Sequence, residues 1–200
     1  MEPKNRWSPL DLTMGSLFVA MMAVGANITS IAPFMVIGGV PITLQTFFAI
    51  LAGLILGSRL GALSLFTYML LGLAGAPIFA QFKGGFAILL SPTFGFIVSF
   101  ILIAYIAGKM AEHKRSLPMY ISAAILAMAI NYIFGTNWMY AAYLLWFDAP
   151  EGFTYKMAWY WMVFPLPKDI VLSIFAGVMA YRLETGIVSK SAFRNQKKVA

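Results

Sequence analysis

Long stretches of this chain carry no charged residue, and they limit the folds open to it more than any other feature. Asp11 and Arg59 bracket 47 uncharged residues, and further uncharged runs cover Leu60–Phe82, Gly84–Gly108 and Ser116–Phe147. A helix of about 20 apolar residues crosses a bilayer core of about 30 Å. The first run is long enough for two such helices, and each later run for one. The pattern therefore predicts a polytopic membrane protein.

The composition agrees with this interpretation and excludes a soluble domain. Hydrophobic residues make up 61% of the chain and charged residues only 10%, whereas soluble domains contain about 25% charged residues. The formal net charge of +7 is also typical of nucleic-acid-binding proteins. Here, however, the basic residues flank the apolar runs, and no separate soluble domain remains to carry a basic face. We therefore expect contact with membrane lipid and no nucleic-acid partner.

Residues with catalytic or metal-binding chemistry are scarce. Cysteine is absent, which excludes disulfides and thiol chemistry. The single histidine, His113, lies between Glu112 and Lys114, and no second histidine is present to complete a metal site. Nucleophile elbows and phosphate-binding glycine loops are also missing. The sequence predicts a protein that is not an enzyme and that uses no metal and no cofactor.

Six membrane-spanning helices account for the apolar runs and give an all-α fold in a single integral membrane domain of residues 1–200. Their expected ranges are 11–31, 45–58, 60–77, 91–109, 117–135 and 169–184. With both ends inside, the inner segments carry eleven of the 14 Lys and Arg residues, and the outer segments carry Lys83, Lys156 and Lys168. Because cytoplasmic loops collect Lys and Arg, we expect both termini in the cytoplasm.

Small residues recur at helical spacing in two of these spans. Gly53, Gly57 and Gly61 follow one another every four residues, a spacing that lets helix backbones approach closely. Plain helix packing is the favoured interpretation there. Ser16 and Ala20 form a similar small face on the first span. Two roles stay open for that face, internal packing and the docking of a partner.

The three expected outer segments are rich in Gly and Pro yet largely apolar, unlike ordinary exposed loops. They cover residues 38–45, residues 75–85 with 91–95, and residues 163–169. Irregular backbone of this kind is tolerated at membrane depth where it is packed in protein or lines a cavity. The sequence therefore predicts an outward-facing ligand pocket.

Four polar residues in or near these segments are candidates for binding a ligand. Lys83 has no acidic neighbour in sequence, so it is either a site for a ligand anion or a lysine that extends to the outer surface. Asp169 begins an expected span of only about 15 residues, where it either caps the helix or accepts from ligand N–H groups. Lys168 either neutralises Asp169 or contacts the ligand. Asn131 either bonds a neighbouring helix or lines the pocket.

At these residues the sequence resembles the BioY family, the biotin-specific substrate-binding (S) components of energy-coupling-factor (ECF) vitamin transporters. The resemblance covers nearly the whole chain. It is carried by three segments in order, Val40-Pro41-Ile42-Thr43-Leu44-Gln45, Gly75-Ala76-Pro77 to Gly85 with Pro92-Thr93-x-Gly95, and Pro165 to Asp169. It implies a six-helix fold in a bacterial or archaeal cell membrane, which captures biotin outside the cell. It also implies two kinds of partner, a transmembrane coupling subunit and two cytoplasmic ATPase subunits.

The resemblance also implies roles for particular residues. Gln81, Lys83 and Asp169 match the ligand-contacting polar residues of the family, and the segment around Thr43 and Gln45 matches the cover over its pocket. Ser16 and Ala20 match its docking surface for the coupling subunit, with Ser16 in place of the usual alanine.

Biotin has a carboxylate tail, an apolar ring and chain, and a ureido head with N–H donors and a carbonyl. Lys83, the aromatic residues Phe79 and Phe82, Asp169, and Gln81 or Asn131 supply a matching set of groups.

One departure from the family pattern leaves the ligand open. The family commonly has a glycine before the aspartate and a lysine three residues after it, where this chain has Lys168 and Leu172. Either Lys168 takes over the positive charge, or the pocket suits another small carboxylate such as lipoate or a biotin precursor. Two further classes are alternatives to a binding protein. They are an intramembrane enzyme, for which no nucleophile–base pair or metal triad is found, and a structural membrane protein without a ligand.

Overall fold

The computed structural model describes residues 7–28, 36–37 and 40–186. Within these residues the chain is helical, which confirms the all-α class. The α-helices are α1 Pro9–Asn27, α2 Gln45–Leu56, α3 Ser58–Leu73, α4 Phe94–His113, α5 Leu117–Leu145, α6 Tyr155–Met162 and α7 Leu166–Gly186. Two short 3₁₀ helices, η3 Ala80–Phe82 and η4 Phe86–Leu90, follow α3. A minimal antiparallel ladder pairs β1 Val36–Ile37 with β2 Val40–Pro41.

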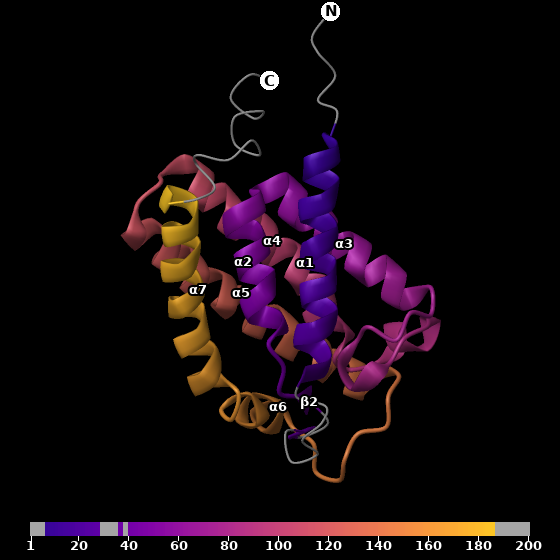
Figure 1. Cartoon of the computed structure of the whole chain (residues 1–200). Coiled ribbons are helices and arrows are strands. Elements are labelled where there is room, and N and C mark those ends of the chain that lie inside the picture. Colours follow the sequence, from indigo (N-terminus) through magenta and orange to yellow (C-terminus); the bar gives the residue numbers. More distant parts are fainter. Residues whose placement is uncertain (1–6, 29–35, 38–39, 187–200) are drawn as a thin grey trace, which may run out of the picture.

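The helices form a bundle in which α4 packs against α2, α3 and α5, and α7 packs against α2 and α5. The first residues of α1 and the last residues of α7 lie at the same end of this bundle (Figure 1). The short helix α6 lies across the opposite end, near β2 (Figure 1). The segments between helices at this second end, which we call the loop end, hold the candidate site described below.

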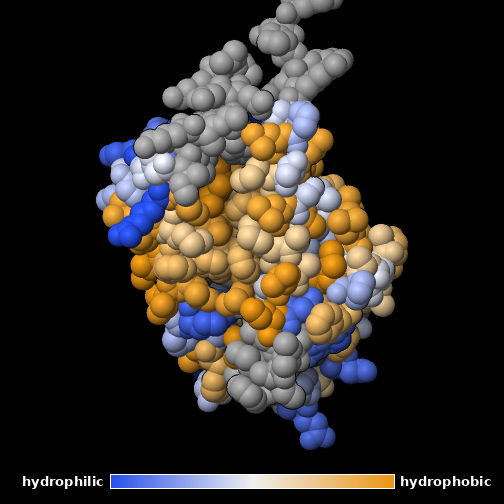
Figure 2. Space-filling model, viewed as in Figure 1, coloured by the Kyte–Doolittle hydropathy of each residue, from blue (hydrophilic) through white to orange (hydrophobic). Residues whose placement is uncertain are grey.

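The face of the bundle seen in Figure 2 is apolar over its middle and polar towards its ends. Large hydrophobic side chains on several helices, among them Leu17, Phe66 and Ile133, are exposed, which a water-soluble surface does not tolerate over a wide area. Three helices, α1, α4 and α5, are long and apolar enough to cross a membrane, and α6 with α7 forms a fourth candidate span bent by 52°. These features describe a multi-pass membrane protein.

The expected count of six spans is not decided by helix length. The helices α2 and α3 contain 12 and 16 residues, which correspond to about 18 and 24 Å at about 1.5 Å per residue. Neither is long enough alone to cross a hydrocarbon core of about 30 Å. Both are apolar and pack against α4, so six crossings stay a prediction. Residues 29–31 of the first expected span lie outside the described residues.

Two expected helix boundaries were wrong. The helix α5 continues to Leu145, beyond the expected end at residue 135, because no Gly or Pro interrupts residues 136–145. The helix α7 begins at Leu166 and runs for 21 residues, so it is not the short span of about 15 residues expected from Asp169. Pro167 does not delay its start, since proline is tolerated in the first turn of a helix.

Gly53 in α2 and Gly61 in α3 confirm the helix-packing interpretation, whereas Gly57 lies at the break between these helices. A Cβ atom added at Gly61 would lie 3.0 Å from the carbonyl oxygen of Ala52 on α2. A Cβ atom added at Gly53 would lie 2.2 Å from the carbonyl oxygen of Ala104, so α2 and α4 are in backbone contact there. Gly57 has a φ of 86° and separates α2 from α3, a conformation that favours glycine. Glu112 caps the start of α3, because its carboxylate accepts from the backbone N–H of Ser58 at 2.7 Å.

Candidate functional site

A cavity lies at the loop end of the bundle, between the beginnings of α2 and α7, the middle of α5 and the segment that follows α3. The volume open to the centre of a water molecule is about 120 Å³, whereas a single bound water requires only about 10–15 Å³. The structure brings eight residues predicted to bind the substrate to its wall. They are Thr43, Gln45, Phe79, Gln81, Lys83, Asn131, Lys168 and Asp169.

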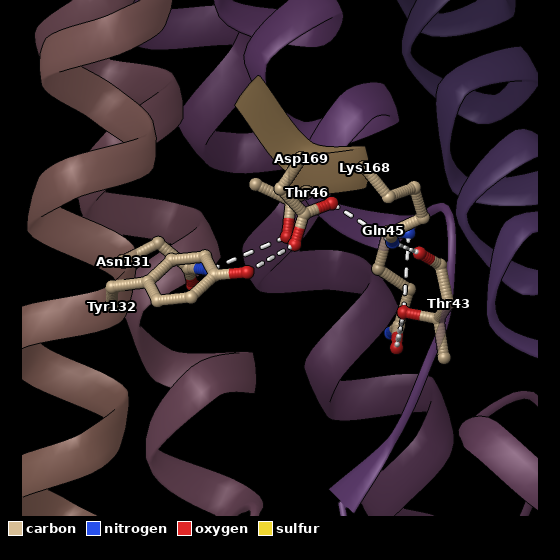
Figure 3. Close-up of polar contacts among 7 residues, drawn as sticks. All are labelled: Thr43, Gln45, Thr46, Asn131, Tyr132, Lys168 and Asp169. Atoms are coloured by element: carbon tan, nitrogen blue, oxygen red, sulfur yellow. Dashed lines mark hydrogen bonds and ion pairs between the residues drawn. The ribbon is translucent and has the colours of Figure 1, made fainter. Parts of the chain in front are cut away.

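A buried carboxylate forms one side of the cavity. Asp169 lies in the first turn of α7 and is 5% exposed. Its Oδ1 lies 2.8 Å from the Nζ of Lys168, and its Oδ2 accepts a hydrogen bond of 2.6 Å from the hydroxyl of Tyr132 (Figure 3). A buried charge is tolerated when it is paired and hydrogen-bonded in this way. The expected pairing of Lys168 with Asp169 is therefore present, and a contact between Lys168 and the ligand stays a prediction.

Lys168 also connects α7 to the segment that precedes α2. Its Nζ donates to the backbone carbonyl of Thr43 (Figure 3). The hydroxyl of Thr43 in turn donates to Oε1 of Gln45 at 3.2 Å. Gln45 is buried at the first residue of α2, and its Nε2 donates to the hydroxyl of Tyr68 at 3.0 Å. Gln45 is therefore a fixed part of the wall, while the covering role expected for this segment stays a prediction.

Another part of the cavity wall is formed by residues of the segment from Phe79 to Lys83. Phe79 is buried, and its ring packs edge-on against the ring of Tyr68 with centroids 5.5 Å apart. The backbone N–H of Phe79 donates to the carbonyl of Lys83 at 3.0 Å, which closes a tight turn. Gln81 and Phe82 in this turn have φ values of 62° and 54°, which non-glycine residues rarely adopt.

Lys83 and Lys168 are the two cations on the described wall of the cavity. Lys168 is paired with Asp169, whereas Lys83 is exposed and forms no ion pair with any described acidic residue. The cavity therefore has one neutralised cation beside its carboxylate and one cation available to an anion. Phe82, expected in the apolar wall, was a wrong assignment, because its side chain is 62% exposed and does not line the cavity.

Asn131 joins three helices at the inner part of the cavity. Its Oδ1 accepts from the hydroxyl of Ser99 on α4 at 2.6 Å, and its Nδ2 donates to the hydroxyl of Thr46 on α2 at 3.3 Å. The interpretation that Asn131 bonds neighbouring helices is therefore confirmed. Asn131 also lines the cavity, and a direct contact with a ligand stays a prediction.

Several wall residues were missed by sequence reasoning. The polar ones are Thr46, Ser91, Thr93 and Tyr132, and the apolar ones include Ile88, Phe96, Ile97, Phe100 and Met162. The available signal for such residues is a polar group inside an apolar span. This signal identified Asn131, and Tyr132 also has such a group but was not distinguished from the other tyrosines. The described residues contain no group of three or more His, Asp or Glu residues that could hold a metal ion.

The helix α1 presents Ser16 and Ala20 away from the bundle. Both residues are exposed, whereas Gly15, Phe18 and Met22 on the other side of the helix are buried. The alternative that Ser16 and Ala20 pack internally is therefore wrong. Their role as a docking surface stays a prediction.

Comparison with known proteins agrees with this architecture. A putative biotin transporter BioYB of Bacillus subtilis is 40% identical over 185 residues, covering 92% of each chain. A biotin transporter BioY of Thermotoga maritima is 40% identical over 125 residues, covering 62% of this chain and 71% of that one. A probable biotin transporter BioY of Pyrococcus horikoshii is 38% identical over 174 residues, covering 87% and 96%.

A solved structure has the same fold. It is the crystal structure of the S-component for biotin from an ECF-type ABC transporter, which matches with a TM-score of 0.64 at 19% identity over 90% of this chain and 95% of that chain. The model of the BioY family matches residues 2–188. This protein therefore belongs to the BioY family.

Proposed function

We propose that this protein is the S component of an ECF-type transporter and that it captures biotin in the cavity at the loop end. The observation that carries the proposal is the placement of a buried carboxylate and an ion-pair-free lysine on the wall of one cavity whose other residues are about equally apolar and uncharged polar. Family membership supports a role in transport rather than catalysis.

The cavity matches the chemistry of biotin group by group. The Asp169 carboxylate, which already accepts the Tyr132 hydroxyl hydrogen, offers an acceptor to the N–H groups of a ureido head. The amide of Asn131, which lines the cavity, offers a donor to the ureido carbonyl. Ile88, Phe96 and Phe100 offer apolar surface to the ring and chain. Lys83 is the favoured partner of the carboxylate tail, because a charge-assisted hydrogen bond there does not compete with an existing ion pair.

We further propose that the protein crosses the membrane six times, with the cavity facing outward and both termini in the cytoplasm. Among the described residues, the loop end carries Lys83, Lys156 and Lys168. The opposite end carries Arg59, Lys109, Lys114, Arg115 and Arg182. By the positive-inside rule, the end opposite the loop end is the cytoplasmic one. The Lys and Arg residues of 1–6 and 187–200, which were part of the sequence count, lie outside the described residues.

The proposal includes partners that supply energy. No phosphate-binding glycine loop occurs in the sequence, and we propose that the partners implied by the family resemblance, a coupling subunit and two cytoplasmic ATPase subunits, supply the energy for uptake. The exposed small face at Ser16 and Ala20 on α1 is the proposed docking surface for the coupling subunit. Small side chains there allow a partner helix to approach closely.

Mass spectrometry of the ligand that copurifies in mild detergent tests the proposal directly. We expect a bound species with the mass of biotin, released on denaturation and displaced by added labelled biotin. Lipoate and dethiobiotin are added in parallel competitions, because the chain has Leu172 where the family commonly has a lysine. Displacement by lipoate but not by biotin would contradict biotin as the ligand and keep the role of small-carboxylate capture.

A further inference from the structure

The last turn of α1 contacts two of the segments that contribute to the cavity wall, the one before α2 and the one after α3. The carbonyl of Gly25 accepts from the backbone N–H of Leu44 at 2.9 Å, beside the wall residues Thr43 and Gln45. Two residues later, Oδ1 of Asn27 accepts from the backbone N–H of Phe82 at 2.7 Å, beside the wall residues Gln81 and Lys83. Neither Gly25 nor Asn27 lines the cavity itself.

The orientation of the Asn27 amide is set by three partners. Its Nδ2 donates to the carbonyl of Ala23 at 3.0 Å and lies 3.4 Å from the carbonyl of Ile78. Its Oδ1 is then the atom that faces the N–H of Phe82, which only an acceptor satisfies. Asn27 is 8% exposed, so water has little access to replace it. This side chain therefore contacts the Phe79–Lys83 turn on both sides, through the carbonyl of Ile78 just before it and the N–H of Phe82 within it.

That turn needs an external support. Gln81 and Phe82 are successive non-glycine residues with positive φ, and such a conformation persists only when the surroundings impose it. The hydrogen bond that the Phe82 N–H donates to Asn27 supports the backbone at the second of these two residues. Gln81 and Lys83, on either side of Phe82, take their direction into the cavity from this backbone.

We infer that Asn27 is a positioning residue for ligand binding, which holds the turn that carries Gln81 and Lys83 without contacting the ligand. The inference rests on the proposed function for its ligand, and it adds a residue of α1 to the binding apparatus. The helix α1 therefore carries two features. Its exposed face has the proposed docking residues, and its last residue, Asn27, supports the ligand-binding turn. A displacement of α1 is thereby transmitted to the position of Lys83.

Two substitutions separate the acceptor role of Asn27 from its size. Asn27→Leu keeps the number and branching of the side-chain heavy atoms and removes every side-chain hydrogen bond, whereas Asn27→Asp keeps the acceptor for Phe82. Asn137→Leu is the control, because Asn137 on α5 donates to the carbonyl four residues earlier, as Asn27 does, but its hydrogen-bond partners, Ile133 and Tyr155, lie outside the ligand-binding turn. Since the charge introduced by Asn27→Asp would repel a carboxylate ligand, affinities are measured by calorimetry for biotin and for its neutral amide.

We expect Asn27→Leu to weaken both ligands about tenfold, because the partly buried N–H of Phe82 is left without its acceptor and the turn that carries Gln81 and Lys83 loses its support. Asn27→Asp should bind the neutral amide within about threefold of the unaltered protein, and Asn137→Leu should match the unaltered protein for both ligands. Unchanged affinity in Asn27→Leu, or equal losses of the amide in Asn27→Leu and Asn27→Asp, would overturn the inference.

Hydrogen exchange of the ligand-free protein provides a readout that does not depend on the ligand. The amide of Phe82 should exchange at least tenfold faster in Asn27→Leu and remain protected in Asn27→Asp. Absence of biotin binding by the unaltered protein would contradict the proposed function, while this exchange measurement would still decide the role of Asn27. If Asn27→Leu does not fold, Asn27→Ala replaces it in the exchange measurement, and an unchanged rate there would count against the inference.

Discussion

The hydroxyl of Tyr132 on α5 donates to Oδ2 of Asp169 on α7 at 2.6 Å, and this bond holds the carboxylate oxygen that Lys168 does not pair with. The two oxygens of Asp169 therefore point in set directions before any ligand arrives. A prearranged acceptor loses less conformational freedom on binding than a mobile one does. The bond joins helices that the sequence alone does not place in contact.

Tyr132→Phe is expected to weaken biotin about five- to tenfold, because the net worth of one hydrogen bond is about 1 kcal/mol and the carboxylate also loses its orientation. The neutral amide should lose the same factor, since both ligands share the ureido head. Calorimetry measures both affinities. Tyr140→Phe on the same helix is the control, because Tyr140 does not line the cavity. Unchanged affinity in Tyr132→Phe would show that the bond does not serve the ligand.

Much of the fold was predictable because a bilayer imposes a simple rule on the chain. The uncharged runs predicted five of the six longer helices, and the short apolar stretch after Asp169 predicted the sixth. The helices α2 and α5 begin at Gln45 and Leu117, where spans were expected to begin. The helix α6 and its bend relative to α7 were not predicted, since the sequence of Tyr155–Met162 gives no sign of a separate helix across the loop end. Helix ends inside apolar sequence depend on packing that composition does not express.

The candidate site was partly predictable for the same physical reason. Lys83, Asn131 and Asp169 stand out because charge and amide groups are expensive in apolar surroundings. Tyr132 does not stand out, since the chain has nine tyrosines and only a partner distinguishes one from another. The support of the loop by Asn27 joins residues 55 positions apart, and no local pattern encodes a contact of that separation.

Gly53→Ala tests the close packing of α2 on α4. The added Cβ would lie 2.2 Å from the carbonyl oxygen of Ala104, so the helices must separate or strain. We expect a loss of about 1–3 kcal/mol in the free energy of unfolding, typical of an overpacked core, measured by thermal or denaturant unfolding in detergent. Gly186→Ala is the control, because nothing lies within 4 Å of its added Cβ. Equal stability of the two variants would argue against backbone contact at Gly53.

Single cysteines test the proposed topology, and the natural chain contributes no background because it contains none. Cysteines at Lys83 and Lys156 should react with an impermeant maleimide added to intact cells, whereas cysteines at Lys109 and Lys114 should react only after the membrane is opened. The charge asymmetry between the two ends of the bundle is the physical reason. Labelling of Lys114→Cys from outside would invert the orientation, and a mixed pattern would change the number of crossings.

Ala20→Trp tests the proposed docking face. Ala20 is exposed on α1, and a large ring there should keep a partner helix from close approach. Uptake of labelled biotin by cells should fall at least tenfold, while calorimetry on the isolated protein should give an unchanged affinity. Leu102→Trp is the matched control, since Leu102 is an exposed residue in the middle of α4. Loss of binding together with uptake would place this face in the ligand site and not at a partner.

Lys83→Ala, compared with Lys168→Ala, separates the two ends of the ligand. Lys83 lines the cavity without an acidic partner among the described residues, so its proposed role is to hold the carboxylate tail. Removal of a charge-assisted hydrogen bond costs about 1.5–3 kcal/mol, which corresponds to a loss of about tenfold or more for biotin. The neutral amide should change much less, because it presents no charge to Lys83. Lys156→Ala, which removes a lysine outside the cavity, should leave both affinities unchanged.

The Lys168→Ala arm of this comparison should give a different pattern, because Lys168 neutralises Asp169 at 2.8 Å. Its removal leaves a buried carboxylate with one donor fewer, so the acid and the amide should weaken to the same degree. Calorimetry of the three lysine variants with both ligands therefore assigns each cation. Equal losses of acid and amide in Lys83→Ala, with a selective loss of the acid in Lys168→Ala, would exchange the two roles and place the carboxylate tail beside α7.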